Sequence, residues 1–224
     1  MISIIVCGAT GRMGQSILQQ IALDADCKLA YASNRTTPLE KGLEKGNVII
    51  DFTLPEPTMT HVALAVKTGK PIVIGTTGFT QEQTDTIKQA AKKIPIVLAP
   101  NMSIGVNVLW HLIAEASRAL GTDFQISISE THHIHKKDKP SGTAKKMAEI
   151  VKNFRKAEPQ MTSLREGEVI GDHRIVFETG QERLEIAHHA KTRDIFAQGS
   201  VTAAKWLIEK PAGLYDMQDV LELS

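Results

Sequence analysis

The chain has 224 residues, of which 42% are hydrophobic, and its 26 basic and 25 acidic side chains leave a formal net charge of +1. This length is enough for one large domain or two modest ones. The near balance of charge excludes a strong field that would attract nucleic acid or an anionic membrane. No apolar stretch approaches the ~20 residues that a membrane span needs.

The N-terminus and the two cysteines favour a soluble cytoplasmic protein. Residues 1–6 form an apolar run without the basic region and cleavage site of a signal peptide, so we predict that they form a strand. Cys7 and Cys27 both lie in apolar, strand-like runs. Two buried thiols are therefore more plausible than a disulfide, which agrees with a reducing cytoplasm.

The first hundred residues alternate between predicted strands and helices. Strands are expected at 2–7, 28–32, 48–52, 71–74 and 94–99, and helices at 17–22, 61–67 and 81–92. About fifteen residues separate the second strand from the third, which is too few for a full crossover helix with its loops. Strands that alternate with helices indicate an open parallel α/β sheet.

The pattern changes after Asn101. An amphipathic helix is expected at 106–120, and apolar and polar side chains alternate at 124–129, 173–178 and 183–188. Such alternation is typical of an antiparallel or mixed sheet that is covered on one face. Later segments with apolar helical faces, at 199–207 and 217–221, are expected to return to the first sheet.

The predicted fold class is therefore α/β, with two domains. Residues 1–103 together with 195–224 are expected to form a Rossmann-type parallel-sheet domain. Residues 104–194 are expected to form an α+β domain inserted into it.

A glycine-rich segment, Gly8-x-x-Gly11-x-x-Gly14, joins the first predicted strand to the first predicted helix. Glycine there permits a tight turn and lets backbone N–H groups approach a pyrophosphate at the helix N-terminus. An ordinary strand-to-helix turn also uses glycine, but the place at the first junction favours dinucleotide binding. The residues expected to bind the cofactor are Gly8, Thr10, Gly11, Arg12, Met13 and Gly14. Arg12 would pair with a phosphate, the alternative being a solvated side chain.

The end of the second strand bears on which cofactor is preferred. NAD-preferring sites usually place Asp or Glu about 20 residues beyond the glycines, where it bonds the ribose hydroxyls. This chain has Asn34 and Arg35 there. No carboxylate repels a 2′-phosphate, and Arg35 is suited to bind that phosphate or to stack on adenine. We predict a preference for NADPH over NADH, the alternative being a surface turn with an incidental arginine.

Six motifs follow in order along the chain. They are Asp51-Phe-Thr-x-Pro-Glu56, Gly75-Thr-Thr-Gly78-Phe79, Ala99-Pro-Asn101-x-Ser-x-Gly105-Val-Asn107, Glu130-x-His132-His133-x-His135-Lys136-x-x-x-Pro140-Ser141-Gly142-Thr143-Ala144, Gly180-x-Glu182-Arg183-Leu-Glu185 and Leu214-Tyr-Asp-Met-Gln-Asp-Val-Leu221. Together they resemble the 4-hydroxy-tetrahydrodipicolinate reductase family, also called dihydrodipicolinate reductase, over essentially the whole chain. The His-His-x-His-Lys segment joined to Pro-Ser-Gly-Thr is highly specific to that family.

The resemblance implies an enzyme of lysine and diaminopimelate biosynthesis that uses NADPH or NADH to reduce 4-hydroxy-tetrahydrodipicolinate to tetrahydrodipicolinate. The substrate is a ring with two carboxylates that loses water and accepts a hydride at carbon 4. A group that titrates near neutrality then supplies a proton. His132 matches the family's proton donor, and Lys136 matches a residue that binds substrate and assists.

Other site residues follow from the same resemblance. His133 matches a substrate-binding position, and a weaker match places Arg193 near the substrate. Ser141, Gly142 and Thr143 open a helix and are expected to hold one carboxylate, although an ordinary helix cap is compatible with this. The positions expected to contact the nicotinamide are Gly75, Thr76, Thr77, Ala99, Asn101 and Met102. The first domain would bind the dinucleotide, and the inserted domain would bind substrate and form a homotetramer.

Three alternatives stay open. His132, His133 and His135, with His188 and His189 downstream, suggest a zinc site by composition. Neighbouring residues on a strand point to opposite faces, however, so no metal is predicted. A regulatory protein that senses NADPH without catalysis would keep the glycine segment but has no reason to keep the histidine motif. A related dicarboxylate or amino-acid dehydrogenase would share the architecture and differ in its substrate pocket.

The chain departs from the family's usual pattern on the adenosine side. The stretch between Arg35 and Asn47 is shorter than in most members. Leu54 replaces a frequent arginine. Both departures bear on cofactor preference and affinity rather than on the chemistry. Met102, at a position expected to contact the nicotinamide, stands where an aromatic residue is common and can still pack on that ring.

Overall fold

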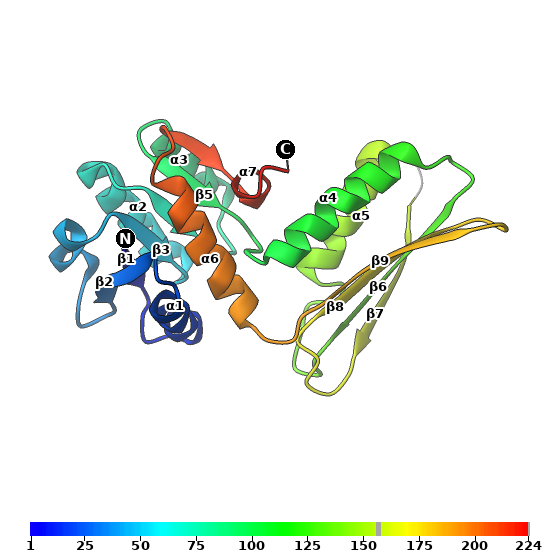
Figure 1. Cartoon of the computed structure of the whole chain (residues 1–224), viewed down its shortest axis with the longest axis horizontal. Coiled ribbons are helices and arrows are strands. Elements are labelled where there is room, and N and C mark those ends of the chain that lie inside the picture. The colour runs from blue at the N-terminus through cyan, green and yellow to red at the C-terminus, as the bar shows by residue number, and fades with distance from the viewer. Residues whose placement is uncertain (156–157, 224) are drawn as a thin grey trace. The chain divides into compact units, whose positions relative to one another are not determined.

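The computed structural model describes residues 1–155 and 158–223 and divides the chain into two compact units (Figure 1). Unit 1 comprises Met1–Ser103 and Asp194–Ser224, and unit 2 comprises Ile104–Arg193. Asp194 thus belongs to unit 1, whereas the sequence analysis assigns it to the inserted domain. The binding role of each unit stays a prediction, and residues 156, 157 and 224 of the predicted domains lie outside the described residues.

Unit 1 contains a six-stranded parallel sheet. Its strands are β1 (Ile2–Cys7), β2 (Cys27–Ser33), β3 (Val48–Asp51), β4 (Ile72–Ile74), β5 (Pro95–Leu98) and β10 (Gly213–Tyr215), in the order β10-β5-β4-β3-β1-β2. All the pairs are parallel. The carboxyl ends of these strands therefore meet at one edge, where ligands bind in open α/β sheets.

Helices cover both faces of this sheet (Figure 1). They are α1 (Arg12–Leu23), α2 (Pro55–Thr68), α3 (Gln81–Ala91), α6 (Asp194–Leu207) and α7 (Met217–Val220). On β1, Ile4 and Val6 face a core shared with α1, α6 and α7, whereas Ile5 faces a second core shared with α2 and α3. Burial on both faces explains why the strands are almost continuously apolar.

The connection from β2 to β3 contains two short 3-10 helices, η1 (Leu39–Lys41) and η2 (Leu43–Lys45), in place of a crossover α-helix. Leu39 and Leu43 are buried in the second core. A Cβ on Gly42 would lie 2.1 Å from the ring of Tyr31, so this position must remain glycine for the turn to pack on β2. The short connection therefore closes as the sequence analysis expects, without a full helix.

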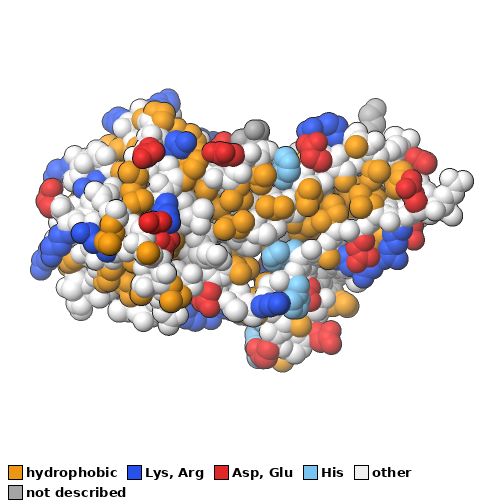
Figure 2. Space-filling view, viewed as in Figure 1, with side chains coloured by type: hydrophobic (Ala, Val, Ile, Leu, Met, Phe, Trp, Pro, Cys, Tyr) orange, Lys and Arg blue, Asp and Glu red, His pale blue; other side chains and the backbone are white. Residues whose placement is uncertain are grey.

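Unit 2 is a four-stranded mixed sheet with two helices on one face (Figure 1). Its elements are α4 (Ile104–Ala119), β6 (Gln125–His132), α5 (Gly142–Phe154), β7 (Gln160–Arg165), β8 (Asp172–Glu178) and β9 (Arg183–His189). The order is β7-β6-β8-β9, with β6 parallel to β7 and antiparallel to β8. A hydrophobic core lies between the helices and the sheet. Leu112 on α4 and Leu184 on β9 are exposed. Hydrophobic side chains also gather on the surface over this unit (Figure 2).

These two sheets confirm the predicted α/β class with an α+β insertion. Two strands were not predicted, however. The side chains of β7 are mostly exposed, so the strand lacks the apolar alternation that marks β8. The strand β10 is only three residues long. In addition, α2 begins at Pro55, earlier than the expected start at residue 61, because proline suits the first turn of a helix.

Among the described residues, no helix combines the length and apolar character needed to cross a bilayer.

Candidate active site

The glycine-rich segment of unit 1 forms a tight turn between β1 and α1. Gly8 has a positive φ of 70°, and a Cβ there would lie 2.8 Å from Cγ2 of Thr53. A Cβ on Gly14 would lie 2.2 Å from the carbonyl oxygen of Gly8. The first glycine therefore permits the turn, and the last lets α1 pack closely against it, as dinucleotide-binding turns require.

The other predicted residues of this segment surround the start of α1. Gly11 is the N-cap and has no side chain to cover the first amides of the helix, which begins at Arg12. Thr10 and Arg12 are exposed, and Met13 is partly buried against the core. Exposed amides at a helix N-terminus form an anion site, and Arg12 adds a positive charge beside it.

Asn34 organises the turn that follows β2. Its Oδ1 accepts hydrogen bonds from the backbone N–H of Thr36 at 2.8 Å and of Thr37 at 3.0 Å, and from the Thr36 hydroxyl at 2.8 Å. Arg35 is exposed on this turn. Since the oxygen of Asn34 is occupied, the amide nitrogen is the part of its side chain suited to contact a cofactor, and it is a hydrogen-bond donor.

A polar network links the ends of β3 and β4. The buried Asp51 accepts hydrogen bonds from the backbone N–H and hydroxyl of Thr53, at 2.9 and 2.6 Å, and contacts Nδ1 of His61 at 2.7 Å. The hydroxyl of Thr58 lies 3.3 Å from that of Thr53 and donates to Thr76 at 3.1 Å. Because Thr53 also packs on Gly8, the network ties the glycine turn to the Gly75–Gly78 loop. The sequence analysis includes Asp51 and Thr53 in a motif but does not predict His61.

Cys7 lies beside this network at the end of β1. Its sulfur, a carboxylate oxygen of Asp51 and a ring nitrogen of His61 all lie within 4.8 Å of one another. Burial raises the pKa of the Cys7 thiol, and the charge of Asp51 adds to that effect. The Cys7 thiol therefore ionises less readily than an ordinary cysteine.

The loops after β4 and β5 carry the positions predicted to contact the nicotinamide. A Cβ on Gly75 would lie 2.2 Å from the ring of Phe52, Thr76 is buried in the network, and Thr77 is exposed. Ala99 is buried, and Asn101 accepts a hydrogen bond from the backbone N–H of Ser103 at 2.9 Å. The side chain of Met102 is only 1% exposed and packs in the core. A contact between Met102 and a cofactor would therefore involve its backbone.

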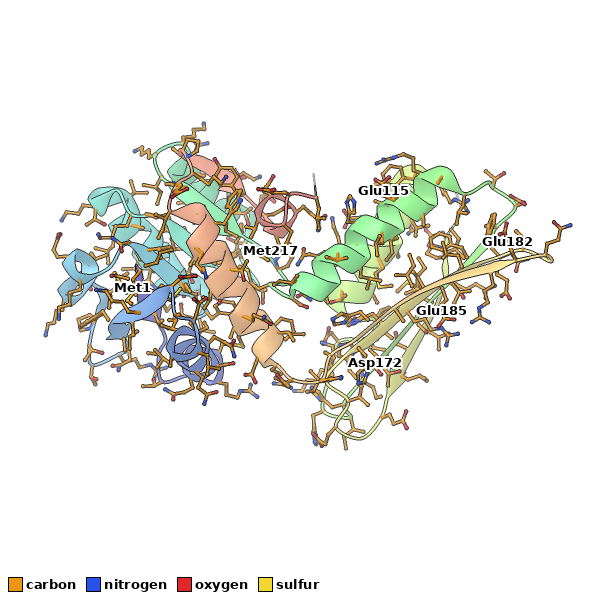
Figure 3. The ribbon with its side chains drawn as sticks, in the orientation of Figure 1. Met1, Glu115, Asp172, Glu182, Glu185 and Met217 are labelled. Carbon is orange, nitrogen blue, oxygen red and sulfur yellow. The ribbon has the colours of Figure 1, made fainter. Side chains whose placement is uncertain are left out.

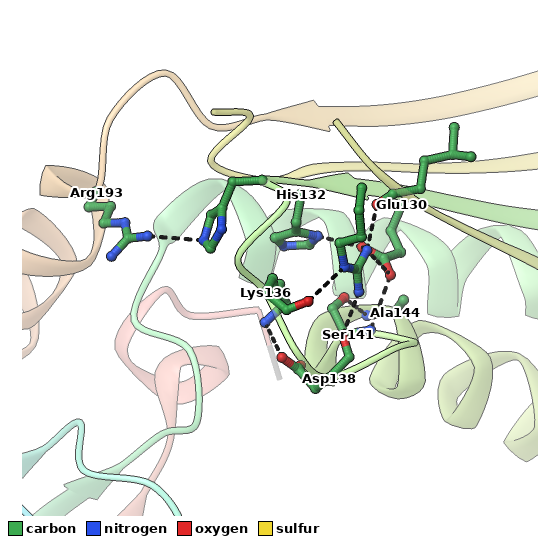
Figure 4. A network of polar contacts seen from close by, with 10 residues as sticks. Glu130, His132, Lys136, Asp138, Ser141, Ala144 and Arg193 are labelled. Atoms are coloured by element: carbon green, nitrogen blue, oxygen red, sulfur yellow. Dashed lines mark hydrogen bonds and ion pairs between the residues drawn. The ribbon is translucent and has the colours of Figure 1, made fainter. Parts of the chain in front are cut away.

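In unit 2, the predicted proton donor His132 ends β6 and is hydrogen-bonded through Nδ1 to a carboxylate oxygen of Glu130 (Figure 4). The Glu130 side chain is completely buried and lies on the same face of β6, two residues earlier. Nη1 of Arg165 donates to both carboxylate oxygens of Glu130, at 3.0 and 3.1 Å. With Nδ1 engaged, Nε2 is the ring nitrogen of His132 left to act on a substrate.

Burial and charge oppose each other at these two residues. Burial works to raise the pKa of Glu130, but hydrogen bonds from Ser163, His132 and Arg165 outweigh it and hold that pKa below its ordinary value. Burial lowers the pKa of His132, and the charges of Lys136 and Arg165 add to this, whereas Glu130 partly opposes it. In the ligand-free protein, the imidazolium of His132 is thus a stronger acid than an ordinary histidine.

The segment after β6 carries the other motif residues. Nζ of Lys136 lies 2.7 Å from a carboxylate oxygen of Asp138. Nε2 of His133 lies 3.1 Å from Nη2 of Arg193, whereas Nε2 of His135 lies 3.6 Å from Glu168. The three motif histidines therefore contact three different partners. Only His132 lies on β6, whereas His133 and His135 lie on the segment after it, with their ring centroids 6.0 Å apart, so strand alternation does not describe these two residues.

Ser141, Gly142 and Thr143 form the start of α5. The Ser141 hydroxyl caps the helix by accepting a hydrogen bond from the backbone N–H of Ala144 at 3.2 Å, and its own N–H donates to Glu130 at 3.3 Å (Figure 4). Gly142 is exposed, and a Cβ there would meet open space. Helix capping and an exposed N-terminal turn thus occur at the same place, and both suit an anionic group.

Two further histidines, the buried His173 and the partly buried His188, were not predicted as site residues. His173 on β8 is 5% exposed, and its ring lies edge-on to that of His132 with centroids 5.1 Å apart. His188 on β9 is the cross-strand partner of His173. Burial lowers the pKa of His173 to about 3, with the charges of His132 and His188 adding to the effect. His173 is therefore neutral over the physiological range.

Sequence reasoning also missed Arg165. The residue pairs with His132 across β6 and β7, but β7 has no apolar pattern that would have revealed it as a strand. Glu130 stands in the quoted motif without a role. The available signal was its place two residues before His132, which puts both side chains on one face of a strand.

Comparison with known proteins gives the family. Residues 2–102 match the family model described as dihydrodipicolinate reductase, N-terminus, and residues 105–221 match the one described as dihydrodipicolinate reductase, C-terminus. The 4-hydroxy-tetrahydrodipicolinate reductases of Trichlorobacter lovleyi and Geobacter metallireducens are each 40% identical to this chain over 266 aligned residues, covering 100% of both proteins. Because this chain has 224 residues, these relatives carry residues that it lacks. The sequence analysis places such a difference between Arg35 and Asn47.

Solved structures are similar in fold. A dihydrodipicolinate reductase from Paenisporosarcina sp. TG-14, solved with dipicolinate bound, has a TM-score of 0.86 and 23% identity, with 98% of each chain covered. A probable dehydrogenase from Thermotoga maritima has a TM-score of 0.67 and 12% identity, covering 99% of this chain and 93% of the other. Since two family models span nearly the whole chain and full-length relatives are 40% identical to it, this chain belongs to the dihydrodipicolinate reductase family.

Proposed function

We propose that this protein catalyses the reduction of 4-hydroxy-tetrahydrodipicolinate to tetrahydrodipicolinate with a nicotinamide cofactor, in lysine and diaminopimelate biosynthesis. The observation that carries the proposal is the arrangement at the end of β6, where Glu130 binds Nδ1 of His132 while Lys136 follows on the adjoining segment. A sensor protein would have no use for a buried carboxylate that orients an acid. The full-length relatives bear the same activity in their names.

His132 is the proton donor of the proposed reaction. Hydride delivery to carbon 4 of the dehydrated ring leaves an electron pair that protonation must trap, and Nε2 of His132 supplies that proton. The pKa of His132 is lowered by burial in the ligand-free protein. Two substrate carboxylates beside the imidazole of His132 would favour its protonated form and raise that pKa. His132 would therefore take up its proton when the substrate binds.

The substrate carboxylates bind to positive groups of unit 2. Lys136 offers an ammonium group on the segment after β6, and the start of α5 at Ser141–Thr143 offers backbone amides with the positive end of a helix dipole. His133, which contacts Arg193, lies on the same segment as Lys136. A dianionic ring suits this combination better than a neutral one.

The cofactor lies on the carboxyl edge of the unit 1 sheet. The turn at Gly8–Gly14 would hold the pyrophosphate, and the loops at Gly75–Thr77 and Ala99–Met102 would hold the nicotinamide. NADPH is the preferred cofactor, because the turn after β2 offers the donor groups of Asn34 and Arg35 and no carboxylate.

Oligomeric state and location form part of the proposal. The sheet of unit 2 has helices on one face, and its other face exposes polar side chains such as Ser127 and Arg174. A homotetramer assembled through this open face, in the cytoplasm, fits the buried thiols of Cys7 and Cys27 and the biosynthetic role.

A coupled assay tests the activity. The substrate is generated in situ from pyruvate and aspartate semialdehyde by the preceding synthase, and oxidation of NADPH and NADH is followed separately. Oxidation that depends on the synthase product is expected. Absence of turnover with either cofactor, together with measurable nucleotide binding, would favour the sensor instead.

The same assay tests cofactor preference with Arg35→Ala. Loss of one charged contact to a 2′-phosphate is expected to lower kcat/KM for NADPH about tenfold or more and to leave kcat/KM for NADH unchanged. Equal values for the two cofactors in the unchanged protein would overturn the preference and leave the reaction intact.

A further inference from the structure

Arg165 contacts three parts of unit 2 at once. Its side chain is 13% exposed, and Nη1 donates to both carboxylate oxygens of Glu130 at 3.0 and 3.1 Å. Nε donates to the carbonyl oxygen of Lys136 at 3.2 Å, and Nη2 donates to that of Asp138. One guanidinium therefore joins the end of β7 to the middle of β6 and to the segment that carries Lys136. The fork of donors in arginine makes this possible, whereas a lysine ammonium has a different geometry.

Glu130 is the buried partner on which these contacts converge. Its completely buried carboxylate faces Nδ1 of His132, Nη1 of Arg165 and the N–H of Ser141, which precedes α5 (Figure 4). An isolated carboxylate in that place would be strongly unfavourable, so it must be paired and hydrogen-bonded to remain charged. The pairing with Arg165 meets this requirement and leaves the charge of Glu130 beside the imidazole.

We propose that Glu130 and Arg165 are positioning residues that place both groups of the reaction. Glu130 fixes the tautomer and orientation of His132, with the proton of Nδ1 directed to the carboxylate and Nε2 directed to substrate. Arg165 fixes Glu130 and also the backbone of Lys136 and Asp138, and through them the ammonium group of Lys136. The inference rests on the proposed function, because it takes His132 and Lys136 as the groups that act on substrate.

The charges around His132 determine what a substitution would do. Glu130 on β6 faces the ring, Arg165 approaches from β7, Lys136 follows on the same segment, and His173 lies against the ring from β8. Of these groups, Glu130 is the one that raises the pKa of His132, while Lys136 and Arg165 lower it. Since His173 is neutral at ordinary pH, removing the charge of Glu130 leaves the lowering effects unopposed.

The decisive variant is Glu130→Gln, which keeps the shape of the side chain and loses its charge. The titration of the His132 imidazole is expected to move to lower pH. A proton donor is active below its pKa, so the alkaline fall of kcat/KM should move to lower pH with it. Each unit of movement lowers kcat/KM ~tenfold at a fixed pH above the pKa. Binding of NADPH should be unchanged.

Arg165→Lys tests the second half of the proposal. The charge stays, but one ammonium cannot reach both Glu130 and the two carbonyl oxygens, so the segment carrying Lys136 loses its anchor. A higher KM for substrate, together with lower kcat, is expected. Arg118→Lys is the matched control, because Arg118 forms an exposed pair with Glu115 on α4 of the same unit, away from the open face of the sheet, with 2.8 Å between Nη1 and Oε1 (Figure 3). The control should leave both parameters unchanged.

The measurements are NMR titration of the histidine rings, with His132→Gln used to assign the signal, and pH profiles of kcat/KM. If Glu130→Gln moves neither the imidazole titration nor the pH profile, the inference is overturned. A moved titration with unchanged activity supports the positioning of His132 and refutes its role as proton donor, so the two failures are distinguishable. If Glu130→Gln does not fold, Arg165→Lys decides the question, and wild-type KM and kcat in that variant would overturn the inference.

Discussion

The ring of His173 lies edge-on against that of His132, with centroids 5.1 Å apart, and both nitrogens of His173 are buried without a hydrogen-bond partner in the described part of the chain. A neutral imidazole fits this setting, because a second proton would place a buried charge beside His132. Burial of the ring lowers the pKa of His173 to about 3 for the same reason.

This relationship predicts how stability depends on pH. The folded-state pKa of His173 lies below the unfolded value of about 6.5, so the unfolded chain binds a proton that the folded chain refuses. The resulting stability is complete above about pH 6.5 and is lost as pH falls toward 3, by at most ~1.4 kcal/mol per pH unit. His173→Phe should therefore flatten the acid side of the stability curve, measured by urea unfolding at several pH values. His135→Asn, at an exposed histidine, is the control, and an unchanged slope in His173→Phe would contradict the assignment.

Removal of the proposed proton donor should affect chemistry and not nucleotide binding. His132→Gln is expected to lower kcat by about a hundredfold to ten-thousandfold, while the Kd for NADPH, measured by fluorescence or calorimetry, stays the same. His135→Gln should retain full activity, since the His135 side chain is 71% exposed. Equal loss of nucleotide binding in His132→Gln would show that the division of labour between the two units is wrong.

Gly171 leaves space for Nε2 of His132. A Cβ at Gly171 would lie 3.0 Å from that nitrogen and 3.4 Å from Cε1 of His173. Gly171→Ala should therefore crowd the nitrogen that faces substrate, raising KM or lowering kcat in steady-state assays, with little loss of stability. A Cβ at Gly180, on the same unit, meets nothing within 4 Å, so Gly180→Ala should behave as wild type. Normal kinetics in Gly171→Ala would mean that the substrate does not approach Nε2.

The close packing of α1 on the glycine turn predicts a different defect. Gly14→Ala would bring a methyl group to 2.2 Å from the carbonyl oxygen of Gly8 and 2.7 Å from Cα of Ala9. Both are backbone atoms, so the helix must shift, at a cost of about 1–3 kcal/mol in stability. Loss of NADPH affinity should accompany the fall in Tm. Wild-type affinity in this variant would argue against pyrophosphate binding at the start of α1.

The sequence predicts those parts of the fold whose residues show a local pattern of burial or spacing. The strands of unit 1 are buried on both faces, so their composition reveals them, and the glycine spacing at Gly8–Gly14 fixes the turn that follows β1. The exposed strand β7 carries no such pattern.

The residues of the candidate site that the sequence did not predict also lack a local pattern. His132 and Lys136 stand in one motif, and their places follow from the motif alone. Arg165 joins them through the pairing of β6 with β7, at a separation of 35 residues from Glu130. His173 and His188 meet through the pairing of β8 with β9. Strand register is a property of the folded sheet, and local propensity does not specify which polar residues it brings together.

The short connection after β2 has one more consequence. In the described part of the chain, β2 pairs with β1 alone, so one side of β2 is an open row of N–H and C=O groups. Such an edge invites pairing with another chain, and charged side chains and local irregularities oppose it. Here Lys28 is exposed on β2, and the register with β1 shifts between Ile4 and Ile5. A longer connection between β2 and β3 would have room to cover this open edge. With the short connection, the charge of Lys28 and the irregular register of β2 oppose aggregation instead.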